Sequence, residues 1–363
     1  MKSRLLDVMG DALSLVKKSN LAEATALLRN ALAGGAATSA GAGRAAAPRA
    51  RRPLGEVIGA LRAGRSLFPK VADAPGKALP EALDDKFTSR NHRGAAGALN
   101  YRLYVPADHA KRDLALLVML HGCTQNPEDF AVGTQMNALA DEFGLIVAYP
   151  HQPRGANASG CWNWFDKRHQ NRGSGEPAKL AGLAQSLGAE FGIGEERTFA
   201  AGLSAGGAMA EILAATYPDV FEAVGIHSGL PYKAASDVPS AFAAMKGGAI
   251  GESALRVVGD GIRRKIIFHG GADATVHPAN AQCILDQAQR GAEALKPIEL
   301  DWEIPGGRVN RTVLQDGAGR ALVEHWFVEG GGHAWFGGDS RGTYTQNVGL
   351  DASRVMVRFF LKQ

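Results

Sequence analysis

The hydrophobic pattern of the chain alternates between short apolar runs and helix-like segments. Continuous apolar runs bounded by turn residues are typical of strands buried on both faces of a parallel sheet. The alternation of such runs with helices predicts an α/β fold with a mostly parallel, doubly wound sheet. The runs are 114–120, 145–149, 198–201, 223–227, 265–268 and 325–328, and helix-like segments between them include 135–143, 180–191 and 279–292.

Two regions depart from this alternation. Residues 100–105 alternate apolar and polar positions, which predicts a strand exposed on one face. Residues 297–328 contain three strand-like stretches, at 298–304, 312–315 and 321–328, the last two joined across Asp-Gly-Ala-Gly. This pattern predicts an antiparallel hairpin near one edge of the sheet.

The N-terminal quarter of the chain has a different pattern. Residues 4–18 and 21–32 place apolar side chains on one helical face each, which predicts two amphipathic helices. Their apolar faces could pack on each other, on the main domain, on a second subunit or on an apolar surface. We therefore expect three regions: a helical extension at 1–33, a basic Ala/Gly-rich linker and irregular segment at 34–96, and an α/β domain at 97–363. Within the second region, one short helix is expected at 54–64.

The composition adds limits to this picture. The chain has 45% hydrophobic and 21% charged residues, as expected of a globular protein, and no apolar run approaches a membrane span. Residues 1–70 carry 12 Lys and Arg and 4 Asp and Glu, a net charge of +8. The rest of the chain carries 28 Lys and Arg and 32 Asp and Glu, a net charge of −4. The basic character thus belongs to the extension, and we expect no nucleic-acid partner. The first residues lack the apolar core of a signal peptide, which predicts a cytoplasmic protein, with an extracellular one as the alternative.

The motif with the clearest chemistry is Gly-Leu-Ser-Ala-Gly around Ser204. An apolar run at 198–201 precedes it and a helix-like stretch at 209–216 follows. In this strand–turn–helix setting, G-x-S-x-G indicates a nucleophile elbow, in which the serine hydroxyl projects from the top of the sheet.

Partners for such a serine are found after later strands. Asp273 follows the run at 265–268 and His333 follows the run at 325–328. Carboxyl ends of parallel strands meet at one sheet edge, and the order Ser, Asp, His is that of α/β-hydrolases. The imidazole would take the serine proton and the carboxylate would hold the imidazole. His227, His269 and His277 also lie near strand ends, but only His333 is in a glycine loop after the last core strand.

An acyl-transfer site also needs two backbone N–H groups for the oxyanion. Ala205, directly after the serine, should supply one. Cys123, in the turn after the run at 114–120, is the best candidate for the other. Cys123 could itself be a nucleophile, but Ser204 has the elbow. No metal or organic cofactor is implied, because the three cysteines lack metal-ligand spacing.

Five ordered motifs resemble the polyhydroxybutyrate (PHB) depolymerase esterase family, to which feruloyl and acetylxylan esterases are related. The resemblance implies the α/β-hydrolase fold over 97–363, with Ser204 as nucleophile, Asp273 as acid, His333 as base and Cys123 at the oxyanion hole. The motifs are L-H-G-C-T-Q-N-P-E-D-F at 120–130, G-C-W-N-W-F at 160–165, G-L-S-A-G-G-A-M at 202–209, H-G-x-x-D-x-x-V at 269–276 and G-G-H-A-W at 331–335.

Aromatic residues beside these motifs are candidates for the substrate site. Trp162, Trp164, Trp335 and Phe336 could form an apolar wall for an ester, or could anchor the loops that carry the motifs. Cys123 and a second cysteine, at 161, fall in two loops that could meet above the sheet, so a disulfide between them is a hypothesis.

We therefore expect a serine carboxyl-ester hydrolase that acts on short-chain poly(3-hydroxyalkanoate) or its oligomers. A feruloyl or acetylxylan esterase is the alternative within the same chemistry. A different class also remains open: a protein that binds a polymer granule or another surface through residues 1–52, with a vestigial hydrolase domain. The sequence predicts no oligomeric state.

Overall fold

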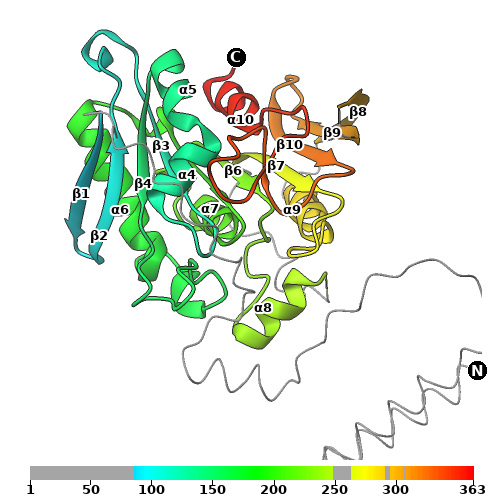
Figure 1. Ribbon diagram of the computed structural model, residues 1–363, viewed down its shortest axis with the longest axis horizontal. Coiled ribbons are helices and arrows are strands. Elements are labelled where there is room, and N and C mark those ends of the chain that lie inside the picture. The colour runs from blue at the N-terminus through cyan, green and yellow to red at the C-terminus, as the bar shows by residue number, and fades with distance from the viewer. Residues whose placement is uncertain (1–85, 248–262, 291–294, 306) are drawn as a thin grey trace, which may run out of the picture. The chain divides into compact units, whose positions relative to one another are not determined.

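The computed structural model of the chain describes residues 86–247, 263–290, 295–305 and 307–363 (Figure 1). The helices expected at 4–18, 21–32 and 54–64 and the basic linker lie outside these ranges. All the described residues belong to one compact unit.

Ten strands of the described residues form one mixed sheet. They are β1 (Phe87–Gly94), β2 (Gly97–Tyr104), β3 (Ala115–Leu120), β4 (Leu145–Pro150), β5 (Thr198–Leu203), β6 (Ala223–His227), β7 (Arg264–Gly270), β8 (Lys296–Ile304), β9 (Gly307–Gln315) and β10 (Ala321–Val328). Their order across the sheet is β1-β2-β4-β3-β5-β6-β7-β10-β9-β8. The neighbours from β4 to β10 run parallel, and β1–β2 and β9–β8 extend the two sides with antiparallel pairing.

Helices cover both faces of this sheet (Figure 1). They are α4 (Pro127–Thr134), α5 (Met136–Phe143), α6 (Gly175–Phe191), α7 (Ala205–Thr216), α8 (Val238–Met245), α9 (Ala279–Arg290) and α10 (Ala352–Leu361), with 3-10 turns η1 (His109–Lys111), η2 (Lys167–His169) and η3 (Glu195–Arg197). One apolar core lies between the sheet and α6, α7 and α9, and the other between the sheet and α4, α5 and α10. A short pair, β11 (Trp335–Phe336) and β12 (Thr345–Gln346), lies apart from the main sheet.

The two cores explain why β3 is apolar at every position. In β3, Leu116 and Val118 belong to one core and Leu117 and Met119 to the other. All four side chains are completely buried. Successive side chains of a strand point to opposite faces, so in a strand such as β3, covered by helices on both sides, apolar residues are favoured at every position. The predicted doubly wound α/β fold is confirmed, including the antiparallel hairpin of β9 and β10.

One strand was missed in the sequence. β1 lies in the segment 34–96 that was predicted as linker and irregular chain, so the sheet begins before residue 97. Of its eight residues only Phe87 is buried, and most of the others are exposed. The strand pattern is therefore absent from its sequence, and β1 forms because its backbone pairs with β2 along its whole length. No helix within the described ranges is long and apolar enough to cross a membrane.

Candidate active site

Ser204 lies at the sharp turn between β5 and α7. Its backbone adopts φ 57° and ψ −117°, a conformation that residues other than glycine rarely adopt and that characterises a nucleophile elbow. Its N–H donates to His227 O at 2.9 Å, which ties the turn to β6. Glycine is required at Gly206, because a Cβ there would collide with the carbonyl oxygen of Leu120 at the end of β3. Ser204 is partly exposed between buried neighbours.

Asp273 and His333 form a hydrogen-bonded pair, with 2.7 Å between Asp273 Oδ2 and His333 Nδ1. The other carboxylate oxygen, Oδ1, accepts from the N–H groups of Thr275 at 2.9 Å and Val276 at 2.8 Å. The Asp273 side chain is completely buried. Burial raises the pKa of Asp273, but the hydrogen bond and the charge of His333, together with the Val276 N–H, outweigh it and hold this pKa below its ordinary value. An ionised carboxylate therefore faces the imidazole and orients its Nδ1–H.

The three residues lie at one edge of the sheet, after the parallel strands β5, β7 and β10. The loops after β7 and β10 are joined directly, since Ala272 N–H donates to Gly331 O at 2.9 Å. Within the described residues no hydrogen bond joins Ser204 Oγ to His333. Contacts of this kind are often long in unliganded enzymes and shorten when substrate binds.

The turn after β3 lies beside Ser204. A Cβ placed on Gly122 would be 3.7 Å from Ser204 Cβ. The Gly122 N–H donates to Gln125 Oε1 and the Thr124 N–H to Ser159 O. In the part of the chain described, the Cys123 N–H between them has no acceptor. Ala205 is the first residue of α7, where N–H groups lack a partner within the helix. Both predicted oxyanion donors are thus backbone groups left available near Ser204.

A disulfide joins Cys123 to Cys161, with 4.2 Å between their Cα atoms. It attaches the turn after β3 to the loop that precedes α6. Trp162, next to Cys161, adds a second attachment, because its Nε1–H donates to His121 O at 3.2 Å. His121 completes the arrangement: its Nε2 accepts from Gln152 N–H, and its Nδ1 lies 2.8 Å from Gly122 O. These contacts fix the backbone that carries the Cys123 N–H.

The other histidines considered have structural contacts. His227 is completely buried, accepts from Phe336 N–H through Nε2 at 3.1 Å and stacks against Trp335. Burial holds the pKa of His227 well below its ordinary value. His269 lies 2.9 Å from Val276 O, beside the Asp273 loop. Exposed His277 accepts from the first N–H of α9 through Nδ1.

The predicted aromatic wall is not formed in this structure. Trp162, Trp335 and Phe336 are completely buried, and Trp164 is 6% exposed. The Trp335 Nε1–H donates to Ser353 Oγ at 2.9 Å. The structure therefore favours the other alternative, in which these side chains anchor the loops that carry Cys123 and His333.

Three site residues were not identified from the sequence. Tyr344 places its ring edge-on to His333, and its hydroxyl lies 3.2 Å from Thr124 Oγ1. Gln125 accepts from Gly122 N–H and donates to Thr343 O, which joins the turn after β3 to the loop before β12. Gln346 accepts from Gly332 N–H, next to His333. Gln125 lies in the motif at 120–130, but nothing in the sequence indicates Tyr344 or Gln346.

Across the described ranges, no cluster of three or more His, Cys, Asp or Glu residues could hold a metal ion. The arrangement at the sheet edge instead provides a strained serine, a carboxylate-bound imidazole and two free N–H groups. Together these features define a site of the serine-hydrolase type on an α/β-hydrolase fold.

The comparison with known proteins is consistent with this class. The family described as Esterase PHB depolymerase matches residues 99–295, so the chain belongs to that family. Poly(3-hydroxyalkanoate) depolymerase C of Paucimonas lemoignei is 33% identical over 60% of this chain and 54% of its own length. Feruloyl esterase B of Neurospora crassa is 31% identical over 56% of this chain and 72% of its own length. The chain thus spans only about half the length of the depolymerase.

A solved structure supports the fold alone. Acetyl xylan esterase from Aspergillus awamori superimposes with a TM-score of 0.58 at 22% identity, over 75% of this chain and 98% of that one. The relatives' names describe carboxylic ester hydrolases, which is the class predicted from the residues.

Proposed function

We propose that this protein is a serine carboxyl-ester hydrolase that cleaves short-chain poly(3-hydroxyalkanoate) and its oligomers. The observation that carries the proposal is the 2.7 Å hydrogen bond between His333 and the buried Asp273, at the sheet edge where Ser204 occupies its strained turn. Membership of the PHB depolymerase esterase family supports the same chemistry.

In the proposed reaction, Ser204 Oγ attacks the ester carbonyl carbon while His333 Nε2 takes the hydroxyl proton. Asp273 stabilises the imidazolium and keeps Nδ1 protonated. The Cys123 and Ala205 N–H groups donate to the tetrahedral oxyanion. His333 then returns the proton to the leaving alcohol, which leaves the acyl group on Ser204. A water molecule, deprotonated by His333, then attacks the acyl carbon. The bond to Ser204 Oγ breaks, His333 returns the proton to Oγ, and the acid is released.

The polyester substrate is proposed from the similarity to the Paucimonas lemoignei depolymerase. The similarity to Neurospora crassa feruloyl esterase B supports a second candidate, an ester of plant polysaccharide. The two candidates share the nucleophile and differ in what binds beside it.

Parallel assays separate the two substrates. The protein is incubated with amorphous polymer granules, methyl ferulate and acetylated xylan, with Ser204→Ala beside the parent in each case. We expect soluble 3-hydroxy acid from the granules with the parent and none with the variant. Turnover of methyl ferulate or acetylated xylan with no release from granules would assign the protein to the second candidate. Release by Ser204→Ala at the parental rate would refute the mechanism.

A further inference from the structure

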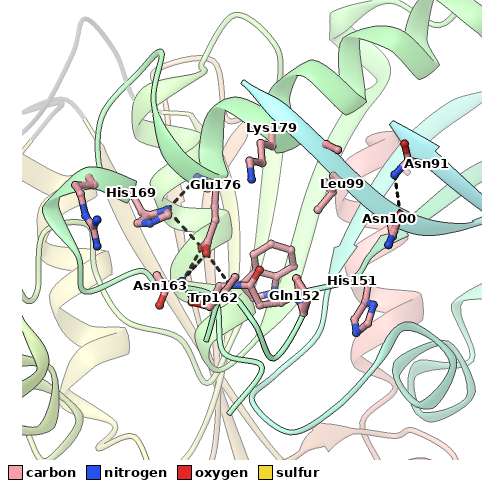
Figure 2. Close-up of a pocket in the computed structure, with 14 residues that line it drawn as sticks. Asn91, Leu99, Asn100, His151, Gln152, Trp162, Asn163, His169, Glu176 and Lys179 are labelled. Carbon is pink, nitrogen blue, oxygen red and sulfur yellow. Dashed lines mark hydrogen bonds and ion pairs between the residues drawn. The ribbon is translucent and has the colours of Figure 1, made fainter. Parts of the chain in front are cut away.

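A cavity of about 450 Å³ lies away from the three proposed catalytic residues. It opens between the β1–β2 hairpin, the loop after β4 and the first turns of α6 (Figure 2). None of Ser204, Asp273 and His333 lines it.

Among the described residues that line the cavity, one is a carboxylate, Glu176, and its oxygens already accept hydrogen bonds from the protein. Glu176, in the first turn of α6, is 6% exposed. Its Oε1 accepts from Gln152 Nε2 and from Asn163 Nδ2, both at 2.6 Å, and its Oε2 accepts from Asn163 N–H at 2.8 Å (Figure 2). Three donors therefore satisfy Glu176, so this carboxylate has little capacity left to accept a hydrogen bond from a ligand.

The groups that remain available in the cavity are mainly donors. Lys179, one turn further along α6, has no acceptor or acidic partner in the described part of the chain. Its stem lies against the hairpin turn, because a Cβ on Gly97 would be 3.2 Å from Lys179 Cε. His169 accepts from Glu176 N–H through Nδ1 at 2.9 Å, so its Nε2 carries the proton when the ring is neutral. Asn100 accepts from Asn91 through Oδ1, and its own NH₂ group has no acceptor among the residues that the structure describes.

We propose that this cavity binds a small hydroxylated carboxylate, with the Lys179 ammonium as the partner of its charge. An unpaired ammonium beside N–H donors is suited to an anionic oxygen ligand. The other cation that lines the cavity, Arg168, is already paired with Asp166. Trp162 lines the cavity but is completely buried, so it offers no exposed ring on which a neutral sugar could stack. Recognition must therefore come from charge and hydrogen bonds.

Two kinds of ligand, from different sources, carry both a carboxylate and a hydroxyl group. The free end that ester hydrolysis leaves on a 3-hydroxyalkanoate oligomer carries both a carboxylate and a hydroxyl group, and this source rests on the proposed function. A uronic acid of plant polysaccharide carries the same groups and would accompany the second candidate.

The test is calorimetric titration of the full chain carrying Ser204→Ala, which prevents turnover of the probe. The probes are the linear dimer of 3-hydroxybutyrate, its methyl ester and glucuronate. We expect one of the two carboxylates to bind. Adding Lys179→Met should weaken that binding about tenfold or more, and the methyl ester should bind correspondingly more weakly than the free acid. Lys179→Arg should retain most of the binding, and Lys111→Met, at an exposed lysine outside the cavity, should leave it unchanged.

Equal affinity of Lys179→Met for the carboxylate, equal affinity for acid and methyl ester, or no binding of either carboxylate would overturn the proposal. Binding of the dimer assigns the polyester source, and binding of glucuronate alone assigns the polysaccharide source. With Ser204 intact, Lys179→Met should hydrolyse a nitrophenyl ester within about twofold of the parent, which shows that the fold is retained. Polymer hydrolysis is measured separately, so its failure would refute the proposed function without changing the binding result.

Discussion

The hydrogen bonds of Asp273 make the variant Asp273→Asn especially informative. Oδ1 accepts from two backbone N–H groups, of Thr275 and Val276, while Oδ2 faces His333 Nδ1. In the asparagine variant the carbonyl oxygen must keep the Oδ1 position, because only an acceptor fits there. The NH₂ group then faces His333 Nδ1 and forces that nitrogen to become the acceptor.

The consequence is a change of tautomer with little change of shape. His333 would carry its proton on Nε2 and could not accept the proton of Ser204. A serine hydrolase with its imidazole in the wrong tautomer loses about 10⁴ in kcat, equivalent to about 5 kcal/mol of transition-state stabilisation. We expect a loss of this order for Asp273→Asn, with KM nearly unchanged because no substrate contact is removed.

The assay is steady-state hydrolysis of a short nitrophenyl ester, with circular dichroism to check the fold. Asp316→Asn is the matched control, because Asp316 Oδ1 also accepts two backbone N–H groups, from Ala318 and Arg320, but in an exposed turn at the β9–β10 connection. It should keep the parental kcat. If Asp273→Asn retained more than about a tenth of the parental kcat, the assigned role of the carboxylate would be wrong.

Three further predictions follow from other contacts. Breaking the disulfide by Cys161→Ser should lower kcat about tenfold, because the Cys123 N–H becomes less well fixed, and complete loss of an oxyanion donor lowers kcat about 10²–10³-fold. The control Cys283→Ser should leave kcat unchanged. An unchanged kcat in Cys161→Ser would refute the role of the disulfide in positioning this donor. Tyr344→Ala, which removes the ring beside His333, should raise KM roughly 2- to 10-fold. Tyr344→Phe, which loses only the contact with Thr124, should change KM less. Equal changes of KM in the two variants would argue against a role for the ring. Burial lowers the pKa of His325 to about 4. Between pH 6.5 and about 4, this histidine is therefore protonated in the unfolded chain and neutral in the folded one. The free energy of unfolding falls as the pH decreases through this window. In urea denaturation at pH 7 and 4.5, His325→Leu should make this fall smaller by about 2–3 kcal/mol, and an unchanged fall would contradict the assignment.

The features that could be predicted from the sequence depend on local pattern. β3 is apolar throughout because both of its faces are buried, so its type can be read from six residues. Ser204 could be assigned because its turn requires glycine at Gly206, and this requirement is visible in the motif. β1 could not be predicted, because its pairing with β2 is made by backbone groups that any sequence possesses.

Side-chain contacts at the site could not be predicted from the sequence for a different reason. Trp335 lies two residues from His333, yet its ring packs against Phe130 in the core, and proximity along the chain does not specify the direction of a side chain. Tyr344 reaches Thr124 across a separation of 220 residues, through a loop whose course depends on the whole domain. Such contacts depend on the tertiary structure and leave no periodic pattern.

The central claim is that Ser204 forms the covalent intermediate. The most direct measurement treats the parent and Ser204→Ala with a nitrophenyl phosphonate ester and follows the mass of the protein and of its peptides. We predict one phosphonyl group per chain, located on the peptide that contains Ser204, with loss of ester hydrolysis in proportion to labelling and no label on the variant. A label on another residue, or continued hydrolysis by fully labelled protein, would contradict the account.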